Sequence, residues 1–443
     1  MSTRHRFFLS ALTVLLWVSL GISASVTDEV AYGWASQGSG TTGGKGGKVD
    51  TVDGSASSAL STINTLLKGA SAEIVFLKGT LAGTIKFGSN KTLIGLHGAQ
   101  INPGSIDCDG DSNIIIRNII LRDAACTTYG GCKGGSDALH VISQANHLWI
   151  DHCDIADGQD GNFDQTHAVD YVTVSNCIFS YSDTSKPHRF SNLVAASDGD
   201  SGEYAITWSY NWWWKNVYER MPRFRYSKSH IVNNLYTSSA NLYCIGVGYK
   251  GMPLIVNNAF IGVNQPIDLR AECDPTLAES HGNLFTNCVG NTATSGKAFA
   301  PPYKMDTLAN PATLAASVGT DFTTNGVLGV MNASQVEGFV RANAGATLFT
   351  THAPVGVMDG PILNQLSSKF QVRGEALYVN SLSGGRVNLS VYDLSGRCIF
   401  SKTNSMVASG TAAIGMGTAR PGTYIYKVSL NKSESGMGKF IVQ

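Results

Sequence analysis

The sequence contains few charged residues and few prolines. Charged side chains make up 14% of the 443 residues, against roughly 25% in an average soluble protein. Lys+Arg and Asp+Glu are equal at 32 each, so the formal net charge is zero. A nucleic-acid partner favours a basic surface, and we therefore expect no nucleic-acid binding. The 12 prolines do not suit a disordered or collagen-like chain, whereas the 49 glycines predict many tight turns.

The cysteines lack the spacing of a structural metal site. No CxxC pair occurs among the nine cysteines, which argues against zinc. Cys126 and Cys132 bracket the segment TTYGG and are candidates for a small disulfide loop. Cys273 and Cys288 are candidates for a second loop.

Long apolar runs are also absent, apart from one near the N-terminus. Arg4 and Arg6 precede an apolar run over residues 7–22, and small residues follow it. This pattern predicts a secretory signal peptide over residues 1–24. The alternative is an uncleaved anchor, but the run is short for a membrane span. We therefore expect a secreted or surface-held protein in an oxidising compartment.

Short strand-like segments recur through the first two thirds of the chain. They are rich in β-branched residues and are bounded by Gly, Asn, Asp or Ser, as in IIIRNIIL from Ile114. Aligned on one core position, they step by 22, 34, 24, 34, 23 and 24 residues. The aligned residues are Ile94, Ile116, Ile150, Val174, Trp208, Ile231 and Ile255. This period predicts a right-handed parallel β-helix, in which equivalent residues stack from coil to coil.

Several conspicuous residues have a structural interpretation under this repeat. Cys153 and Cys177 are 24 residues apart and are expected to stack in the core. Trp208 and Trp213 are expected to face the interior rather than to bind sugar, because side chains alternate along a strand. Amides that stack at a bend of the coil can bond to each other and to the turn backbone; the candidates are Asn176, Asn233 and Asn257.

Two of the steps are 34 residues long and therefore carry about ten extra residues each. The first extra segment holds residues 126–137, and the second holds residues 183–202. Insertions in a solenoid become loops, and loops over one face commonly build the functional site. The spacing thus places the site before any motif is considered.

Acidic and basic clusters flank these insertions. Repeated Asp residues with few nearby bases suggest calcium, although Asp-rich turns explain the pattern equally well. The basic motif RMPRFR runs from Arg220 to Arg225, and Lys186 and Arg189 lie in the second insertion. This combination fits an anionic substrate bridged by a cation, with surface salt bridges as the alternative. The acidic residues are Asp137, Asp151, Asp154, Asp157, Asp160, Asp164 and Asp170.

The order of these motifs resembles the pectate lyase family of polysaccharide lyases (family 1). The resemblance covers roughly residues 90–305 and rests on LWIDHCDI, DGNFDQTHAVDYVTVSNCIF, HRFSNLVAASDGD and NWWWKNVYERMPRFR. It implies a parallel β-helix and calcium-dependent β-elimination on de-esterified polygalacturonate, with 4,5-unsaturated oligogalacturonides as products. It also implies a single chain acting as a monomer.

The resemblance assigns roles to individual residues. Asp137, which opens the DALHV strand, and the carboxylates of Asp160 and Asp164 are implied calcium ligands. A further acid that the family often carries is replaced by Gly135, so that ligand is absent. Asp151, in the WIDH segment, is expected to be structural.

Three basic residues are implied in catalysis. Arg220 resembles the catalytic base that removes the C5 proton, and Arg225 resembles the substrate-binding arginine. Lys186 corresponds most closely to the substrate-binding lysine that precedes the ASDG segment. Arginine is normally charged and would not be chosen as a base from its chemistry alone.

The composition changes again near Phe370. Alternating apolar and polar residues predict a small antiparallel β-sandwich over 370–443, and VYDLSGR, PGTYIYKV and GKFIVQ resemble a type IX secretion sorting domain. That domain implies outer-membrane secretion machinery as a partner, with a carbohydrate-binding sandwich as the alternative. The expected organisation is a signal peptide (1–24), a β-helix lyase domain (25–345), a linker (346–369) and the sandwich.

Two other functions fit the same fold. A pectin lyase would act on methylated substrate, but such relatives lose the acidic calcium ligands, and Asp137, Asp160 and Asp164 argue against it. A non-catalytic β-helix adhesin would not need Lys186, Arg220 and Arg225 together.

Overall fold

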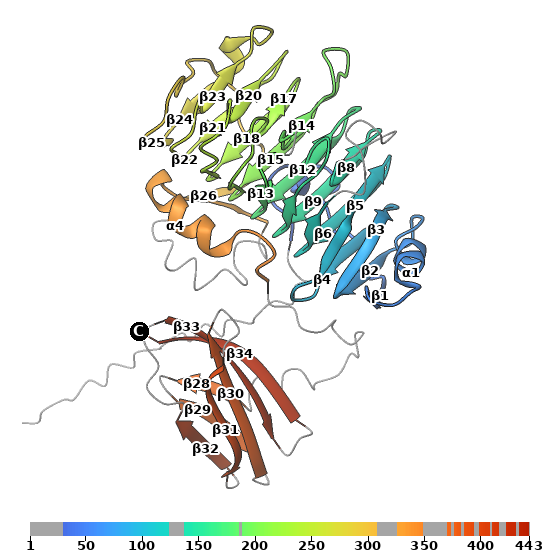
Figure 1. Cartoon of the computed structure of the whole chain (residues 1–443), viewed down its shortest axis with the longest axis vertical. Helices are drawn as coiled ribbons and strands as arrows, with labels where there is room; N and C mark the ends of the chain where they lie inside the picture. Colours follow the sequence, from blue (N-terminus) through green and yellow to red (C-terminus); the bar gives the residue numbers. More distant parts are fainter. Residues whose placement is uncertain are drawn as a thin grey trace, which may run out of the picture. The chain divides into compact units, whose positions relative to one another are not determined.

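The computed structural model describes residues 30–123, 137–185, 188–307 and 326–348, together with the strands of a C-terminal segment between 370 and 442. The chain divides into two compact units, Met1–Gly356 and Val357–Gln443. The expected signal peptide, Lys186, Cys126 and Cys132 lie outside the described residues, as does most of the expected linker. Each unit is considered by itself below (Figure 1).

The first unit is a parallel β-helix, as predicted. One face is a sheet of ten parallel strands, in which neighbours in the stack come from successive coils. Its strands are β1 (Lys48–Asp53), β2 (Glu73–Lys78), β4 (Lys91–Gly95), β6 (Ser112–Arg117), β9 (Asn146–Asp151), β12 (Asp170–Ser175), β15 (Ala205–Ser209), β18 (Lys228–Val232), β21 (Leu254–Val256) and β24 (Glu279–His281).

After its strand in the first sheet, each coil continues into two further short strands. These strands form two rows, called the first and second runs below, and both rows belong to a single second sheet. Both runs join it because the long strand β5 (Gln100–Asp109) pairs with β7 near its start and with β8 near its end. The first run holds β7 (Ile120–Arg122), β10 (Asp154–Ala156), β13 (Ile178–Ser180), β16 (Trp212–Trp213), β19 (Leu235–Tyr236), β22 (Ala259–Ile261) and β25 (Leu284–Thr286). The second holds β3 (Thr80–Lys86), β5, β8 (Leu139–Ile142), β11 (Phe163–Gln165), β14 (Leu193–Val194), β17 (Arg223–Phe224), β20 (Ile245–Val247) and β23 (Ile267–Leu269).

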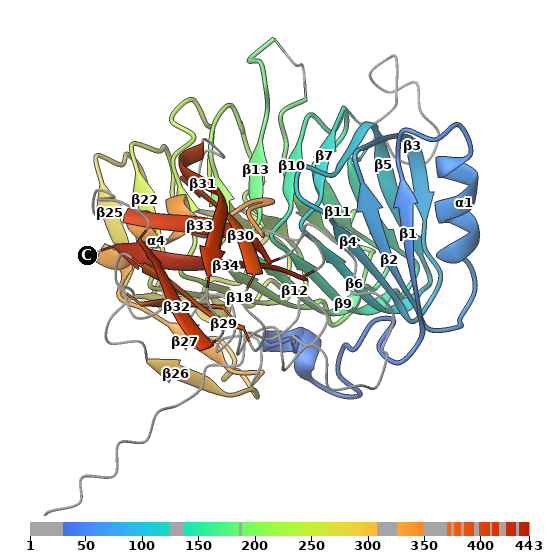
Figure 2. The ribbon, with the colours of Figure 1, turned by 90° about the horizontal axis from the view of Figure 1, so that it is seen from below.

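Smaller elements flank the coils. Helix α1 (Ala59–Leu66) packs on β1, β2 and β3 and covers one end of the stack (Figure 2). Helix α4 (Ala333–Asn343) contacts β19 and β22. The remaining elements are η1 (Gly33–Ser36), η2 (Pro275–Leu277), β26 (Met305–Thr307) and β27 (Leu328–Val330). Among the described residues, no helix is long and apolar enough to cross a membrane.

The stacking predicted from the repeat is confirmed with one shift. Ile116, Ile150, Val174, Trp208, Ile231 and Ile255 are in register along the ten-stranded sheet. The prediction for Ile94 was wrong by one residue, because Leu93 pairs with Ile116 and Ile94 pairs with Arg117. Since side chains alternate, Leu93 lies in the interior and Ile94 packs in a separate cluster outside it.

Aromatic rings form a second column inside the coils. Phe179, Trp213, Tyr236, Phe260 and Phe285 stack with centroid separations of 5.5, 4.8, 4.3 and 5.1 Å. Three of these separations fall in the range that aromatic pairs prefer, about 4.5–7 Å, and the Tyr236–Phe260 pair at 4.3 Å is slightly closer. The expectation that Trp208 and Trp213 are core residues is confirmed, since both are fully buried.

The bend after each strand of the first sheet follows a fixed pattern. Asn176, Asn233 and Asn257 take left-handed backbone angles, with φ of 51°, 56° and 52°, which asparagine tolerates better than most residues. The stacked amides lie one residue later: the backbone N–H groups of successive coils donate to the side-chain oxygens of Asn211, Asn234, Asn258 and Asn283. Earlier in this column the backbone N–H of Cys153 donates to Cys177 Sγ over 3.4 Å, so the predicted stacking of these cysteines is confirmed.

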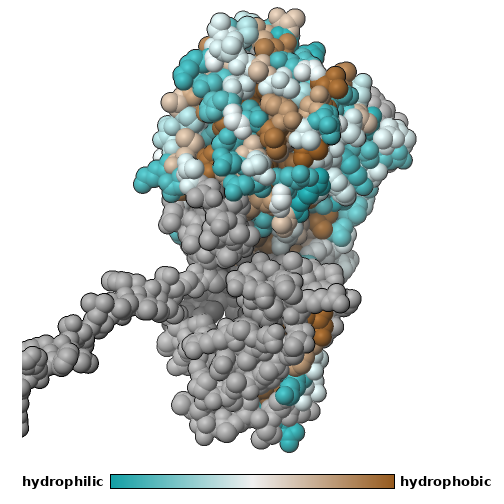
Figure 3. All heavy atoms as spheres, turned by 90° about the vertical axis from the view of Figure 1, so that its left-hand side faces the viewer, coloured by the Kyte–Doolittle hydropathy of each residue, from teal (hydrophilic) through white to brown (hydrophobic). Residues whose placement is uncertain are grey.

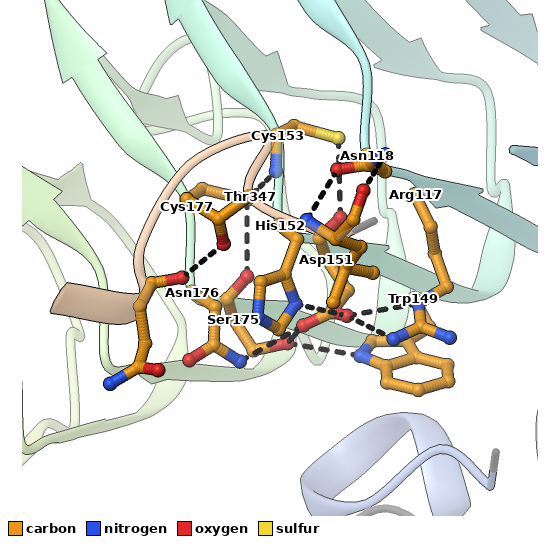
Figure 4. Close-up of polar contacts among 12 residues, drawn as sticks. Arg117, Asn118, Trp149, Asp151, His152, Cys153, Ser175, Asn176, Cys177 and Thr347 are labelled. Carbon is orange, nitrogen blue, oxygen red and sulfur yellow. Dashed lines mark hydrogen bonds and ion pairs between the residues drawn. The ribbon is translucent and has the colours of Figure 1, made fainter. Parts of the chain in front are cut away.

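A buried charged cluster lies at the outer side of the first sheet (Figure 4). Asp151 Oδ2 accepts from Arg117 Nε over 2.9 Å and lies 2.7 Å from His152 Nδ1. Asp151 Oδ1 accepts from Ser175 Oγ and Asn176 Nδ2 over 2.7 and 3.0 Å. Although burial alone would raise the pKa of Asp151, the charges of His152 and Arg117 hold this pKa below its ordinary value. Asp151 thus has the structural role that the sequence predicted.

The predicted disulfide between Cys273 and Cys288 is absent. Both residues carry free thiols, as do Cys108, Cys153, Cys177 and Cys244. The thiol of Cys288 instead donates to backbone carbonyls, including that of Phe260 at 3.3 Å.

The C-terminal unit is antiparallel throughout, as predicted. Its strands form one sheet in the order β28-β29-β32 and another in the order β31-β30-β33-β34. They are β28 (Phe370–Arg373), β29 (Ala376–Ser381), β30 (Gly385–Asp393), β31 (Cys398–Val407), β32 (Gly410–Gly415), β33 (Gly422–Leu430) and β34 (Glu434–Val442).

Candidate functional site

The candidate site residues lie on the second run of the coils and on the loops that enter it. Asp137 stands just before β8, and Asp160 lies in the loop that enters β11. Asp164 lies on β11, while Arg220 and Arg225 flank β17. Since β8, β11, β14 and β17 are neighbours in the sheet, Asp137, Asp164 and Arg220, which are 27 to 83 positions apart in sequence, are brought onto neighbouring coils. Of the first inserted segment only Asp137 is described, and the second contains strand β14, so a site built by the inserted segments stays a prediction.

Two carboxylates of the predicted calcium site converge. A Cβ placed on Gly161 would lie 2.6 Å from Asp164 Oδ1 and 2.9 Å from Asp137 Oδ1, so both oxygens face the same glycine. Asp164 Oδ1 also accepts from the backbone N–H of Leu193 over 2.9 Å. Asp137 Oδ1 is buried and has no hydrogen-bond partner among the described residues.

The third predicted ligand points elsewhere. Asp160 is exposed over 56% of its side chain, and its Oδ1 lies 3.4 Å from His188 Nδ1. Among the described residues, no group of three His, Cys, Asp or Glu side chains is arranged to hold a metal ion. The structure therefore brings Asp137 and Asp164 together and leaves Asp160 beside them.

The acidic site carries uncompensated negative charge. Burial, together with the charges of Asp164 and Asp160, raises the pKa of Asp137 well above its ordinary value. Burial raises the pKa of Asp164 to about 7, against the opposing charge of Arg220 and the Leu193 N–H. Crowded carboxylates of this kind are relieved by a cation, and hard oxygen donors are the ligands that calcium prefers. The orphaned Asp137 oxygen and this donor set fit a calcium ion.

Arg220 is held rigidly beside these carboxylates. Its carbonyl accepts from the backbone N–H of Asn192 on the preceding coil, and the N–H of Met221 donates to Cys244 on the next, both over 2.8 Å. Arg220 itself has a left-handed backbone, with φ of 63°. Non-glycine residues seldom adopt that conformation, and those that do are concentrated at functional sites.

The side chain of Arg220 rests on an aromatic ring that sequence reasoning missed. Its guanidinium carbon lies 4.7 Å from the ring centroid of Phe190, and its buried Nε has no hydrogen-bond partner among the described residues. Phe190 also contacts the ring of His188, with a centroid separation of 3.8 Å. The isolated bridge between Phe190 and Glu219 sets this placement, and no motif in the sequence announces it.

The other arginines of the RMPRFR motif form ion pairs. Arg225 Nε donates to Asp198 Oδ1 over 2.7 Å, and its Nη1 donates to the carbonyl of Ala195 over 3.0 Å. Arg223 Nη2 lies 3.1 Å from Glu272 Oε1.

Arg189, one of the basic residues of the second insertion, makes contacts of its own. Its Nη1 donates to the carbonyl of Asn216 over 2.8 Å, and its guanidinium carbon lies 5.3 Å from the ring centroid of Tyr218. Lys186 lies outside the described residues, so its predicted role stays a prediction.

Comparisons with known proteins agree with this fold. A family model described as pectate lyase matches residues 7–345, and one described as a secretion system C-terminal sorting domain matches residues 373–443. Pectate lyase A of Aspergillus niger is 33% identical over 316 residues, which cover 67% of this chain and 88% of that protein. Pectate lyase A of Dickeya chrysanthemi is 30% identical over 343 residues, which cover 64% of this chain and 85% of that protein.

Solved structures show the same fold at lower identity. A pectate lyase from Bacillus sp. N165, in complex with trigalacturonate, matches with a TM-score of 0.54 and 21% identity. The match covers 72% of this chain and 99% of that one.

Proposed function

Because the chain belongs to the pectate lyase family and is a polysaccharide lyase, we propose that it cleaves de-esterified polygalacturonate by calcium-dependent β-elimination. The products would be 4,5-unsaturated oligogalacturonides. The observation that carries the proposal is that two buried carboxylates with raised pKa values converge on one glycine, within the electrostatic influence of Arg220.

Asp137 and Asp164, joined by Asp160 when its side chain turns inward, would hold the calcium ion. A calcium ion bound there would supply positive charge that makes the C5 proton of the uronate more acidic. Arg225, fixed by Asp198, would bind the same uronate through its remaining N–H donors. Lys186 would do so as well.

Arg220 would remove the C5 proton. The electron pair of the C5–H bond would form the C4–C5 double bond, and the C4–O4 bond would break, with O4 leaving on the neighbouring sugar and taking up a proton from solvent. An arginine in this role is unusual because the guanidinium is normally charged. The assignment rests on the place of Arg220 in the RMPRFR motif, and the ring of Phe190 positions its guanidinium.

The acidic site disfavours the alternative functions. A pectin lyase that acts on uncharged methyl esters has no need for two converging buried carboxylates whose pKa values are raised by burial and by neighbouring negative charge. An adhesin has no need for an arginine held between two coils in a strained backbone conformation.

Release of unsaturated product from polygalacturonate, followed by ultraviolet absorbance with and without a chelator, tests the proposal. We expect turnover that a chelator abolishes and added calcium restores. Turnover that survives complete chelation would contradict the calcium requirement, and greater turnover on fully methylated pectin would favour a pectin lyase.

The C-terminal unit directs the protein to secretion or to the cell surface, as its match to a sorting domain shows. We propose that it engages outer-membrane secretion machinery after a signal peptide over residues 1–24 has been removed. A chain that ends before Phe370 should keep its activity on soluble polygalacturonate and fail to be exported in its native host. Loss of activity on truncation would make this unit part of the catalytic fold instead.

A further inference from the structure

We propose that Arg270 forms a second carboxylate-binding subsite, which holds a uronate two sugar units from the one at Arg225. This inference rests on the proposed function, because it assumes that a polygalacturonate chain occupies the site. It extends the site along the β-helix by two coils.

The strand register places Arg270 in line with Arg225. Val194, Phe224, Val247 and Leu269 are paired in succession across β14, β17, β20 and β23. The residue after each of them is Ala195, Arg225, Gly248 and Arg270 respectively. Neighbouring strands lie about 4.8 Å apart, so the backbones of Arg225 and Arg270 are separated by about 10 Å along the helix axis. That separation is comparable to two linked pyranose rings.

Gly248 lies between the two arginines in this register and lets the side chain of Arg225 pack closely against the coil. A Cβ at this position would lie 2.9 Å from the carbonyl oxygen of Phe224, 3.1 Å from Arg225 Cγ and 3.5 Å from Glu272 Oε1. Any larger residue would therefore displace Arg225 or the strand beside it. The Glu272 carboxylate pairs with Arg223, so its charge is compensated within the chain.

Arg270 is anchored in the same way as Arg225 and retains unused donors. Its Nη1 donates to Asp268 Oδ2 over 2.7 Å, as Arg225 Nε does to Asp198. The guanidinium carbon lies 5.5 Å from the ring centroid of Tyr243, which supports it from one side. Its side chain is 35% exposed, and its buried Nε has no hydrogen-bond partner among the described residues.

The ligand chemistry follows from these features. A guanidinium oriented by one carboxylate can still bind a second one through its free edge, because its five donors are arranged as a fork. Polygalacturonate carries one carboxylate on every sugar. A polymer that runs along the helix axis from Arg225 therefore brings a carboxylate to Arg270 two units away.

A length series of galacturonate oligomers tests the proposal with the full chain and added calcium. kcat/KM is measured for the oligomers from dimer to hexamer and for polygalacturonate, with Arg270→Gln compared with the unaltered chain. We expect a step of about tenfold in kcat/KM when an added sugar first reaches Arg270, because hydrogen bonds to charged groups are stronger than neutral ones. Arg270→Gln should remove that step, raise KM for the polymer by about tenfold and leave kcat and the shorter oligomers unchanged.

Arg122→Gln is the matched control. Arg122 pairs with Asp154 at 2.6 Å on the first run of the coils and has a side-chain exposure of 25%, so it is a partly exposed, ion-paired arginine like Arg270 but lies away from the row that holds Arg225. This variant should keep the length step. Asp268→Asn separates binding from ion pairing, because it frees Arg270 and should leave KM for the polymer unchanged or lower it.

Equal changes for all oligomers, or a rise in KM on Asp268→Asn as large as that on Arg270→Gln, would overturn the subsite. If Arg270→Gln does not fold, Arg270→Lys takes its place, since it keeps the charge but loses the fork and should flatten the step. An unaltered chain without activity on any galacturonate would contradict the proposed function itself, a result distinct from the loss of a length step.

Discussion

Asp151 and the pair formed by Asp137 and Asp164 are all buried carboxylates, yet their pKa values move in opposite directions. Asp151 accepts hydrogen bonds from Arg117, Ser175 and Asn176 and lies against His152, so its pKa falls. Asp137 and Asp164 face each other across Gly161, and their pKa values rise.

The difference separates structure from function. A buried charge that is fully paired and hydrogen-bonded belongs to the framework, whereas a buried charge without a full set of partners costs stability unless a ligand supplies the missing partner. The first cluster is complete within the chain. The second has Arg220 nearby but no full set of partners, and its pKa values stay raised, which makes it a candidate binding site.

The largest expected loss of stability comes from making the complete cluster incomplete. Asp151→Asn keeps the shape but leaves Arg117 buried without its counter-ion, and we expect a loss of about 3–5 kcal/mol in the free energy of unfolding. Denaturant unfolding at constant calcium measures this loss, while kcat of the folded fraction should stay unchanged. Asp154→Asn, which breaks the partly exposed pair with Arg122, is the control and should cost at most about 1 kcal/mol. Equal losses in both variants would refute the contrast.

Removing ligands from the deficient cluster should affect calcium rather than folding. For the double variant Asp160→Ala, Asp164→Ala we expect calcium affinity to fall by more than about 100-fold, because even outer-shell changes cost about 10–100-fold. Calorimetric titration measures this, and Asp154→Ala serves as the control with unchanged affinity. An unaltered affinity in the double variant would remove Asp160 and Asp164 from the site.

The cation of the deficient cluster should matter for turnover. We expect Arg220→Lys to lower kcat by about 100-fold, since a positioned base contributes about 10²–10⁴ and lysine places a compact ammonium differently. Calcium affinity and the free energy of unfolding should change little. Arg225→Lys is the companion variant and should act mainly by raising KM. Near-normal kcat in Arg220→Lys at saturating calcium and substrate would transfer the role of base to another residue, with Lys186 next.

The smallest expected effect is on how the free energy of unfolding without calcium depends on pH. Asp164 and Asp151 should shift this free energy in opposite directions as pH rises. The pKa of Asp164 is raised to about 7 from 3.8, so its contribution to stability is fully present below about pH 4 and is lost as pH rises through 7. The pKa of Asp151 is lowered, so its contribution is present above its unfolded pKa and is lost as pH falls through the folded value. We therefore expect calcium to raise Tm more at pH 8 than at pH 5, and this difference to shrink in Asp164→Asn. A Tm shift by calcium that does not depend on pH would contradict the raised pKa.

The sequence predicted the coils well because their period is fixed by the stacking of identical structural units. Ile116 to Ile255 were aligned correctly, whereas Ile94 was misplaced because the next residue, Gly95, gives no apolar pattern by which to detect a one-residue slip. The acidic and basic site residues were found through motifs.

What the sequence could not provide was contact across the coil. Phe190 meets Arg220 only because a bridge to Glu219 aligns two loops, and Arg117 meets Asp151 from 34 residues away. The prediction of a disulfide between Cys273 and Cys288 was wrong for a related reason, because closeness in sequence does not bring two thiols into bonding geometry. Polar and apolar side chains are interspersed on the face of the β-helix that Figure 3 shows.

The coil-on-coil pairing of the β-helix has a consequence for where the molecule loosens. Each coil is hydrogen-bonded chiefly to the coils on either side of it, so a terminal coil has such a neighbour on one side only. We therefore expect local unfolding to start at the ends and to proceed inward. Helix α1 caps one end, while Leu284 and Val289 stay exposed near the other. Asp137, Asp164 and Arg220 lie on or beside strands β8, β11 and β17, which belong to interior coils. Several terminal coils must therefore unfold before thermal fraying reaches these residues.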